Sequence, residues 1–491
     1  MSTPTEYETR LFINNEYIES KSSETLNLVN PYDGSPLPKS IQVAGPEEID
    51  LAVASATAAF KTGPWSTYTG AQRAKCLNKF ADLLESHASE LATLDAICMG
   101  GPVGISMQLT SISTAPVFRY YAGWADKIEG ESFGADDGTY KIVRHEPLGV
   151  CTGMASWNAP LVYIGWKIAP ALAAGNTYIY KASEKSPLSA LALGKLVIEA
   201  GFPPGVLQFV SGAAKTGALL ASHMKIQKIS FTGSAFVGKI IQKLASDSNM
   251  KKVTLELGGK SPALVFADAD IPNAVGSTAD GFLFNSGEVC VATSRLYVQE
   301  SIAPAFIDAV KARFQAATEN LGANPQEATT THGPMADEAH FNRVMSYIEL
   351  GKKSAQTLIG GSRIGDKGFW IEPTIFLNPA KDSRIAKEEV FGPVLNIVTF
   401  KTEEEAIELA NDTNTGLSAA LYTSDLNRAL RVSAKIEAGN VSINAPHFPS
   451  HQVPFGGFKE SGDGKELGKY GLQSFLQTKS ILINMKLPAK L

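Results

Sequence analysis

From Val150 to Leu257 the chain alternates strand-like and helix-like segments, and this regular alternation constrains the fold more than any other feature. The segments are strand 150–155, helix 160–174, strand 177–181, helix 187–200, strand 206–210, helix 216–223, strand 226–231, helix 235–245 and strand 253–257. Alternation with short turns is typical of parallel β-α-β units and predicts a doubly wound α/β sheet. Such sheets bind ligands beyond the carboxyl ends of their strands.

A second alternation begins at Pro262 and predicts a second α/β domain packed against the first. Its segments are strand 262–267, helix 271–284, strand 294–299, helix 301–317, helix 340–352, strands near 357 and 374, helix 403–411, strand 419–423 and helix 425–436. A chain of 491 residues is too long for one core, which agrees with two or three domains.

The remaining segments lie before and after these alternations. Short strands are expected at 11–18 and 25–29, helices at 47–61, 71–99 and 104–129, and a strand at 140–146. The last residues, Ser480 to Met485, alternate again as a strand. A free chain end is normally polar and frayed, so this apolar end needs a partner.

The composition is that of an ordinary globular chain and excludes several classes. Net charge is 44 − 49 = −5, with 44% hydrophobic and 19% charged residues, so we expect no nucleic-acid or membrane partner. The polar segment 1–10 does not have the features of a signal peptide. The most apolar stretch, 161–174, is interrupted by Lys167 and Pro170 and is too short to span a bilayer.

Cysteine is rare in this chain, and one cysteine lies where chemistry is expected. The four cysteines are Cys76, Cys98, Cys151 and Cys290, and their spacing fits neither a disulfide framework nor a zinc site. A reducing compartment fits this usage best. Cys290 lies in the connection between helix 271–284 and strand 294–299, among small residues that leave room for a ligand. A lone cysteine is more often a buried, inert side chain. A catalytic role for Cys290 therefore needs support from other parts of the chain.

Two stretches at strand ends are candidates for binding a cofactor. Segment 231–238, with Gly233, Ser234 and Gly238, passes from a strand into a helix, whose free N–H groups suit a phosphate. Lys181 and Glu184 follow another strand of the same sheet and could reach the hydroxyls of a ribose. Each has an ordinary alternative, since glycine-containing turns and K-x-x-E pairs are common.

Two further stretches are candidates for catalysis. Asn158 follows strand 150–155, and its amide could donate to an oxyanion, although asparagine is also a common turn residue and helix cap. Glu256 ends the last strand of the first sheet, beside Gly258 and Gly259. A carboxylate there could serve as a general base, or it could be a surface acid before a hinge.

Together these stretches and Cys290 resemble the aldehyde dehydrogenase superfamily from about Leu11 to the C-terminus. Further stretches in the family's order are 167–176, 201–205, 387–393 and 454–459. The resemblance implies that Cys290 is the nucleophile and that the Asn158 amide and the Cys290 backbone N–H hold the oxyanion. It also implies that Glu256 activates water to release the acid and that Lys167 supports the oxyanion site.

The resemblance further implies that the cofactor is NAD. The cofactor-binding residues it indicates are Trp157, Lys181, Ser183, Glu184, Gly233, Ser234, Gly238, Leu257, Glu389 and Phe391. NAD is expected over NADP, because the Glu184 carboxylate would accept from a ribose 2′-hydroxyl and repel a 2′-phosphate.

Several positions depart from the family's common pattern. Gly287-Glu288-Val289-Cys290 replaces the frequent Gly-Gln-x-Cys, a change expected to matter little, and Ala159 stands where an aromatic residue is frequent. We expect a substrate pocket lined by Ala159, Tyr163, His447, Phe448 and Phe455. Because Ala159 removes an aromatic wall and His447 adds a polar group, we expect a bulky, aromatic or oxygenated aldehyde as substrate. His447 and His451 lack further ligands, so no metal site is expected.

The resemblance also implies a division into domains and an assembly. We expect an NAD-binding domain of residues 1–127 and 148–257, with 461–474 returning to it, a catalytic domain of 258–460, and an oligomerisation arm of 128–147 and 475–491. A homodimer or homotetramer follows. Cytoplasm is the expected location, with the peroxisome as an alternative from the terminal Ala489-Lys490-Leu491.

Two other functions remain open from the sequence. One is a CoA-acylating relative, in which CoA takes the acyl group, although Glu256 favours water as the acceptor. The other is a catalytically retired protein that serves as a structural or binding module on the same fold. Intact Cys290, Glu256 and Asn158 argue against it.

Overall fold

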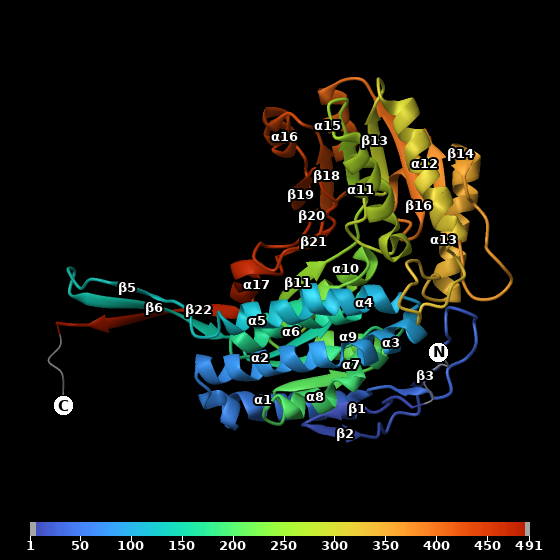
Figure 1. Cartoon of the computed structure of the whole chain (residues 1–491). Coiled ribbons are helices and arrows are strands. Elements are labelled where there is room, and N and C mark those ends of the chain that lie inside the picture. Colours follow the sequence, from blue (N-terminus) through green and yellow to red (C-terminus); the bar gives the residue numbers. More distant parts are fainter. Residues whose placement is uncertain (1–5, 487–491) are drawn as a thin grey trace.

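A computed structural model describes residues 6–486 and contains two large sheets with a narrow three-stranded sheet projecting from the body (Figure 1). The doubly wound α/β prediction is confirmed. The first large sheet has the strand order β2-β1-β9-β8-β7-β10-β11-β21. Its strands are β1 Leu11–Ile13, β2 Glu16–Ile18, β7 Val150–Met154, β8 Thr177–Lys181, β9 Leu207–Val210, β10 Lys228–Thr232, β11 Lys252–Glu256 and β21 Gly462–Asp463.

The five central strands of this sheet, β7 to β11, run parallel, and the outer pairs β9–β1, β1–β2 and β11–β21 are antiparallel. Alternate side chains enter separate cores on the two faces, as the period of a strand requires. Tyr178 and Tyr180 pack in one core, while Ile179 between them packs in the other. The first face is covered by α2 Gly70–Ser86, α3 Ala88–Met99, α4 Val103–Leu109, α5 Ala115–Ala122, α6 Pro160–Ala173, α7 Leu188–Ala192 and α8 Gly194–Glu199, and the second by α1 Pro46–Lys61, α9 Ala214–Ser222 and α10 Ala235–Asp247.

The second large sheet has the order β14-β15-β16-β13-β12-β18-β19 and is parallel except at the β14–β15 pair. Its strands are β12 Pro262–Val265, β13 Arg295–Gln299, β14 Gln356–Ile359, β15 Thr374–Leu377, β16 Val394–Phe400, β18 Ser418–Tyr422 and β19 Asn440–Ile443. The helices of this region are α11 Ile271–Leu283, α12 Ala303–Glu319, α13 Glu338–Ser354, α14 Arg384–Lys387, α15 Glu403–Asn411 and α16 Leu426–Ser433. The chain crosses from the first sheet to the second between Glu256 and Pro262.

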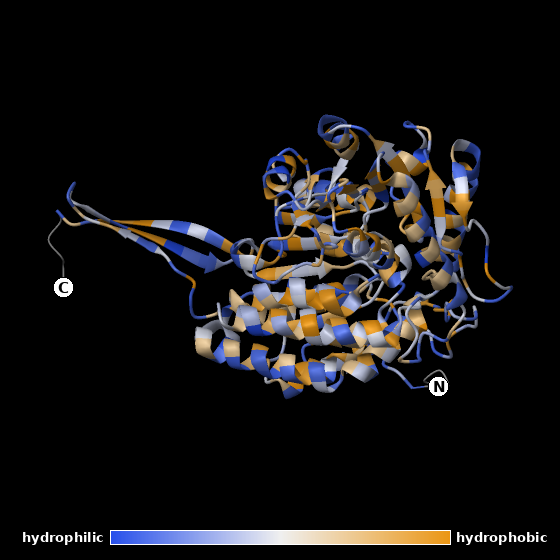
Figure 2. Ribbon diagram, turned by 45° about the horizontal axis from the view of Figure 1, so that its top comes forward, coloured by the Kyte–Doolittle hydropathy of each residue, from blue (hydrophilic) through white to orange (hydrophobic). Residues whose placement is uncertain are grey.

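The projecting sheet consists of β5 Glu131–Phe133, β6 Thr139–Pro147 and β22 Leu476–Asn484. β22 pairs with β6 along its whole length, from Leu476 opposite Pro147 to Asn484 opposite Thr139. The strand prediction for residues 480–485 is therefore confirmed, and the strand begins earlier than expected. Apolar segments lie along the projecting sheet (Figure 2). Leu482 on β22 and Met485 just after it are 67% and 58% exposed. Helix α17 Gly468–Gln473 leads into the strand, and two further strand pairs join β3 Thr25–Leu26 to β4 Ile41–Gln42 and β17 Thr415–Gly416 to β20 Phe458–Lys459.

Three of the expected helices are interrupted. Segment 71–99 divides at His87 into α2 and α3, and segment 187–200 divides at Leu193 into α7 and α8. Segment 104–129 becomes α4, a π-helical turn at Thr110–Thr114 and α5. Pro116 lacks an N–H, so the regular ladder is interrupted there. Strands β16 and β19 were not predicted.

No helix of residues 6–486 is long and apolar enough to cross a membrane. Within the same residues no group of three or more His, Cys, Asp or Glu side chains could hold a metal ion. The terminal Ala489-Lys490-Leu491 lies outside the described residues, so the predicted location remains a prediction. The domain boundaries also remain a prediction.

Candidate active site

The loop before Cys290 has an unusual backbone that a glycine makes possible. Asn285, Ser286 and Gly287 all have positive φ angles, of 49°, 55° and 74°. A Cβ atom on Gly287 would lie 2.5 Å from the carbonyl oxygen of Gly392, so only glycine fits there. The tight turn between α11 and β13 thus presses the loop against residue 392 and fixes where Cys290 emerges.

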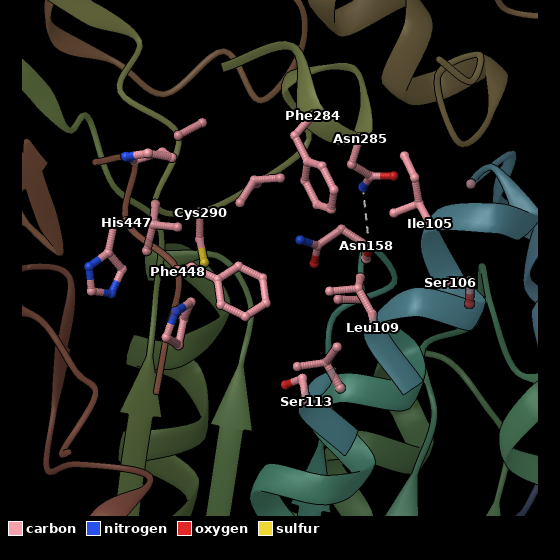
Figure 3. A pocket seen from close by; sticks show the side chains of 18 of the residues that line it. Ile105, Ser106, Leu109, Ser113, Asn158, Phe284, Asn285, Cys290, His447 and Phe448 are labelled. Atoms are coloured by element: carbon pink, nitrogen blue, oxygen red, sulfur yellow. Dashed lines mark hydrogen bonds between the residues drawn. The ribbon is translucent and has the colours of Figure 1, made fainter. Parts of the chain in front are cut away.

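A first cavity of about 270 Å³ opens beside the Cys290 thiol (Figure 3). The five side chains predicted to form the substrate pocket all line it, namely Ala159, Tyr163, His447, Phe448 and Phe455. One wall was not predicted. It comes from the end of α3, from α4 and from the π-helical turn, through Met99, Ile105, Leu109 and Ser113. Most of this lining is apolar or aromatic, so the cavity suits an apolar molecule.

A second cavity of about 300 Å³ also has Cys290 in its lining. Its lining includes Trp157, Gly233, Ser234, Leu257, Glu389 and Phe391, all predicted cofactor residues. Cys290, Asn158 and Tyr163 line both cavities. The thiol therefore stands where a molecule in the first cavity would meet a molecule in the second.

Burial keeps the Cys290 thiol protonated in this arrangement. Desolvation raises its pKa to about 12, and the negative charges of Glu389 and Glu256 add to the rise. Because only the thiolate is a strong nucleophile, Cys290 must lose a proton before it can attack.

Asn158 is held on both sides of its amide. The Tyr163 hydroxyl donates to Oδ1 of Asn158 at 3.0 Å, and Nδ2 donates to the carbonyl oxygen of Glu288 at 3.0 Å. Asn285 donates from Nδ2 to the Asn158 carbonyl oxygen at 3.2 Å (Figure 3). An amide nitrogen carries two hydrogens, so one remains available to a ligand oxygen.

Glu256 ends β11 and is buried without a hydrogen-bond partner for either carboxyl oxygen among residues 6–486. Desolvation raises its pKa well above the ordinary value, and the nearby carboxyl of Glu466 contributes to the rise. Burial therefore favours the protonated form of this carboxyl. Glu256 does not line either described cavity, although its charge is close enough to raise the pKa of Cys290.

Lys167 is fully buried and pairs with a glutamate. The structure places its fully buried ammonium 2.7 Å from Oε1 of Glu466 and 3.0 Å from Oγ of Ser230. Its positive charge lowers the pKa of Glu256 against the larger effect of burial. Lys167 is thus placed beside the carboxyl pair Glu256–Glu466, and its expected support of the oxyanion remains a prediction.

The predicted phosphate-binding turn has the geometry of a helix start. Ser234 is the N-cap of α10 and accepts from the N–H of Val237 at 3.3 Å. Gly238 packs so closely that a Cβ would lie 2.8 Å from Leu257. The first-turn N–H groups and the helix dipole therefore face the second cavity beside Gly233 and Ser234.

Glu389 and Phe391 form the opposite wall of the second cavity. Glu389 accepts from the N–H of Gly259 at 3.0 Å, and burial raises its pKa to about 7. Phe391, at φ 63°, packs edge-on against Trp157 with ring centroids 5.4 Å apart. A bulky residue at a left-handed φ is a strained conformation, which is common at functional sites.

The predicted adenosine contacts lie beyond the second cavity. Nζ of the buried Lys181 is 3.4 Å from Oε2 of Glu184, whose side chain is 46% exposed. Ser183 accepts from the N–H of Lys185 at 3.3 Å. Lys181, Ser183, Glu184 and Gly238 do not line either described cavity.

His447 presents a neutral ring to the first cavity. Its Nδ1 lies 2.9 Å from Oγ of Ser442, and its ring stacks on Phe455 with centroids 6.0 Å apart. Burial lowers the pKa of His447 to about 4. Its Nε2 is buried and has no partner within the described chain, so a polar atom of a bound molecule could use it.

Several site residues could not be found from the sequence. Asn285 and Glu288 hold Asn158, His340 and Arg343 line the second cavity, and Glu466 pairs with Lys167. Histidine and arginine on a helix, or a glutamate in a late loop, carry no local signal of such a role. Among these residues, only Glu288 had a sequence signal, because glutamine is frequent at its position in the family.

Comparison with known proteins identifies the family. A family model described as the aldehyde dehydrogenase family matches residues 17–481. An aldehyde dehydrogenase of Alternaria alternata is 45% identical, covering 99% of this chain and 98% of the relative, and retinal dehydrogenase 2 of Homo sapiens is 44% identical, covering 98% and 92%.

Solved structures agree with this identification. The NAD+ complex of a Bacillus cereus aldehyde dehydrogenase superposes with a TM-score of 0.94 at 39% identity, covering 98% of this chain and 97% of that one. Indole-3-acetaldehyde dehydrogenase of P. syringae, in complex with NAD+ and IAA, has a TM-score of 0.93 at 39% identity with the same coverage. The chain therefore belongs to the aldehyde dehydrogenase family, whose members oxidise aldehydes to acids.

Proposed function

We propose that the protein oxidises a bulky or aromatic aldehyde to the carboxylic acid, with NAD as oxidant and a thioester on Cys290 as intermediate. The observation that carries this proposal is that Cys290 lines both cavities, so that one sulfur atom faces a substrate site and a cofactor site.

The chain's own groups can carry out the chemistry in order. The Cys290 sulfur, once deprotonated, attacks the aldehyde carbon and forms a C–S bond. The free hydrogen of the Asn158 amide and the Cys290 N–H donate to the oxygen as it gains charge. NAD supplies the hydride acceptor when bound. Loss of hydride leaves a thioester on Cys290.

Glu256 then acts as the general base for hydrolysis of the thioester, which releases the acid. Burial raises the pKa of its carboxyl well above the ordinary value, and only the ionised form can accept a proton. Glu256 must therefore ionise before it can take a proton from the water that attacks the thioester. Deacylation should become faster as the pH rises.

The residues of the second cavity fit NAD. The start of α10 offers N–H groups to a pyrophosphate, and the Glu389 carboxylate can accept from ribose hydroxyls. The Glu184 carboxylate is half exposed and would repel a 2′-phosphate near it, an effect that the Lys181 ammonium at 3.4 Å partly offsets. These features support NAD over NADP.

The first cavity supports a bulky substrate. Ala159 leaves space beside Asn158, while Tyr163, Trp166, Phe448 and Phe455 offer aromatic surface. Relatives named for retinal and for indole-3-acetaldehyde agree with such a preference.

A panel of aldehydes tests the proposal in one assay of NADH formation. We expect benzaldehyde-sized substrates to give a higher kcat/KM than acetaldehyde, NAD a higher value than NADP, and CoA no effect. A requirement for CoA would favour the acylating alternative. Absence of any NADH formation across the panel would favour a catalytically inactive protein with a structural or binding role.

We also propose a homodimer or homotetramer joined through the projecting sheet. The sheet extends beyond the body (Figure 2). Another subunit would cover the exposed Leu482, Ile483 and Met485. Light scattering of the intact protein should give at least twice the monomer mass.

A further inference from the structure

Glu288, two residues before the nucleophile, has a buried carboxyl group with a specific partner. The residue is only 2% exposed, and its Oε1 lies 3.3 Å from Nε2 of His340. The same oxygen accepts from the N–H of Ala336 at 3.3 Å. Buried carboxylates are costly unless they are paired, so this contact fixes the side chain in one position.

His340 connects this carboxyl to the second cavity. It lies in the first turn of α13, and its Nε2 is 2.7 Å from the carbonyl oxygen of Phe391. Both neighbours of Nε2 are acceptors, so Nε2 carries the proton and donates to the Phe391 carbonyl, with the Glu288 carboxyl at ion-pair distance. The ring packs edge-on against Trp157 with centroids 5.0 Å apart, and against Phe391 at 6.0 Å.

The backbone of Glu288 connects the same residue to the oxyanion site. Its carbonyl oxygen accepts from Nδ2 of Asn158 at 3.0 Å and from Nδ2 of Asn285 at 3.4 Å. One residue thus contacts the cofactor wall through its side chain and the oxyanion donor through its main chain. A shift of His340 would move the loop that positions both Asn158 and Cys290.

We propose that Glu288 and His340 form a positioning pair that couples occupation of the cofactor cavity to the placement of Asn158 and the reactivity of Cys290. The inference rests on the proposed function, since it takes Cys290 as nucleophile and NAD as cofactor. A ligand that packs against Trp157 and Phe391 also meets the His340 ring. Such a ligand would thereby change the contact between His340 and Glu288 and shift the loop that carries Glu288 and Cys290.

Other charged side chains lie near Glu288 and His340, in or beside the lining of the second cavity. Lys185 lies 5.3 Å above the Trp157 ring, pairs with Asp337 at 2.7 Å, and is close enough to lower the pKa of Glu288 against the larger effect of burial. Glu389 lines the same cavity as His340 and is close enough for their charges to interact. The pair is therefore tested by removing its partners rather than by changing the pH.

The test measures the rate at which iodoacetamide alkylates Cys290, with and without saturating NAD and with no aldehyde present. Cys76, Cys98 and Cys151 are buried, and peptide mass spectrometry assigns the label to Cys290. The variants are Glu288→Ala, which removes the carboxyl, and His340→Phe, which keeps the aromatic packing but loses the donor. Glu288→Gln keeps an acceptor for His340.

In the wild type we expect NAD to change the alkylation rate by about fivefold or more. Glu288→Ala and His340→Phe should reduce this ratio to near one, and Glu288→Gln should retain it. The matched control is His223→Phe, because His223 forms a similar contact to Asp50, at 3.2 Å, on the surface. Its NAD ratio should equal that of the wild type.

The inference is overturned if NAD leaves the wild-type rate unchanged, or if His340→Phe keeps the wild-type ratio while binding NAD in calorimetry. Should Glu288→Ala fail to fold, His340→Phe alone decides, because its ring still fills the space against Trp157 and Phe391. Failure of the proposed function is seen separately, as absence of NAD binding or of NADH formation by the wild type.

Discussion

The hydroxyl of Tyr163 donates a hydrogen bond of 3.0 Å to Oδ1 of Asn158, within the wall that separates the two cavities. The bond fixes which side of the Asn158 amide is oxygen and which is nitrogen. Tyr163 was expected only as a pocket wall, and the structure adds this orienting contact.

Replacement of Tyr163 by phenylalanine keeps the wall and removes the hydrogen bond. We expect the rate of the pre-steady-state NADH burst to fall about fivefold, the equivalent of ~1 kcal/mol, because the amide can then rotate. The matched control is Tyr17→Phe, which removes a 2.7 Å bond to the carbonyl of Leu191 far from the site. An equal burst in the Tyr163 variant and the wild type would show that the bond does not orient Asn158.

Asn158→Ala removes the oxyanion donor itself. The burst rate should fall on the order of 10²–10³-fold, while the affinity for NAD in calorimetry changes little. Slower turnover with an unchanged burst would assign Asn158 to a later step.

Asp95 gives a prediction for stability. This carboxyl at the edge of the first cavity is buried, and desolvation raises its pKa to about 7. The folded chain then binds the proton more tightly than the unfolded chain. The resulting stabilisation is complete below about pH 4 and is lost as the pH rises through 7.

Asp95→Asn cannot ionise and should not show this loss. Thermal unfolding of the wild type and the variant at pH 5 and pH 8 measures it. We expect the wild type to lose stability relative to the variant between these values, by a few kcal/mol at most. A difference in Tm between the two proteins that does not change with pH would refute the assignment.

Truncation after Thr478 tests the assembly. It removes most of the pairing between β22 and β6, which runs from Leu476 to Asn484, together with the exposed Leu482 and Met485. We expect the truncated chain to be monomeric in light scattering. Leu482→Ser is a milder change that keeps the strand and should weaken association. A truncated chain of unchanged mass would place the interface elsewhere.

The sequence predicted most of the fold because its segments alternate clearly. Strands such as 177–181 are short apolar runs between turn residues, and the structure reproduces the Thr177–Lys181 boundaries. The breaks at His87 and Leu193 were missed, because both flanking helices continue the same apolar pattern. β16 was missed because it is buried within a parallel sheet, where strands show no alternation.

Site residues within recognisable sequence motifs were predicted. Those that reach the site only through tertiary contacts were missed. Cys290, Asn158 and Glu389 each follow a strand or turn with a recognisable pattern, and the structure places all three around the second cavity. His340 lies on a different helix, and Glu466 reaches Lys167 across 299 residues. Nothing local in the sequence records such pairings.

The most direct measurement of the central claim uses Glu256→Gln, which should form the thioester but release it slowly. The variant is mixed with NAD and an aromatic aldehyde, quenched in acid after the NADH burst, and digested for mass spectrometry. We predict an acyl mass on the peptide that contains Cys290, in about the same molar amount as the NADH formed, and neither signal in Cys290→Ala. A full NADH burst with Cys290 unmodified, or a burst that persists in Cys290→Ala, would contradict the account.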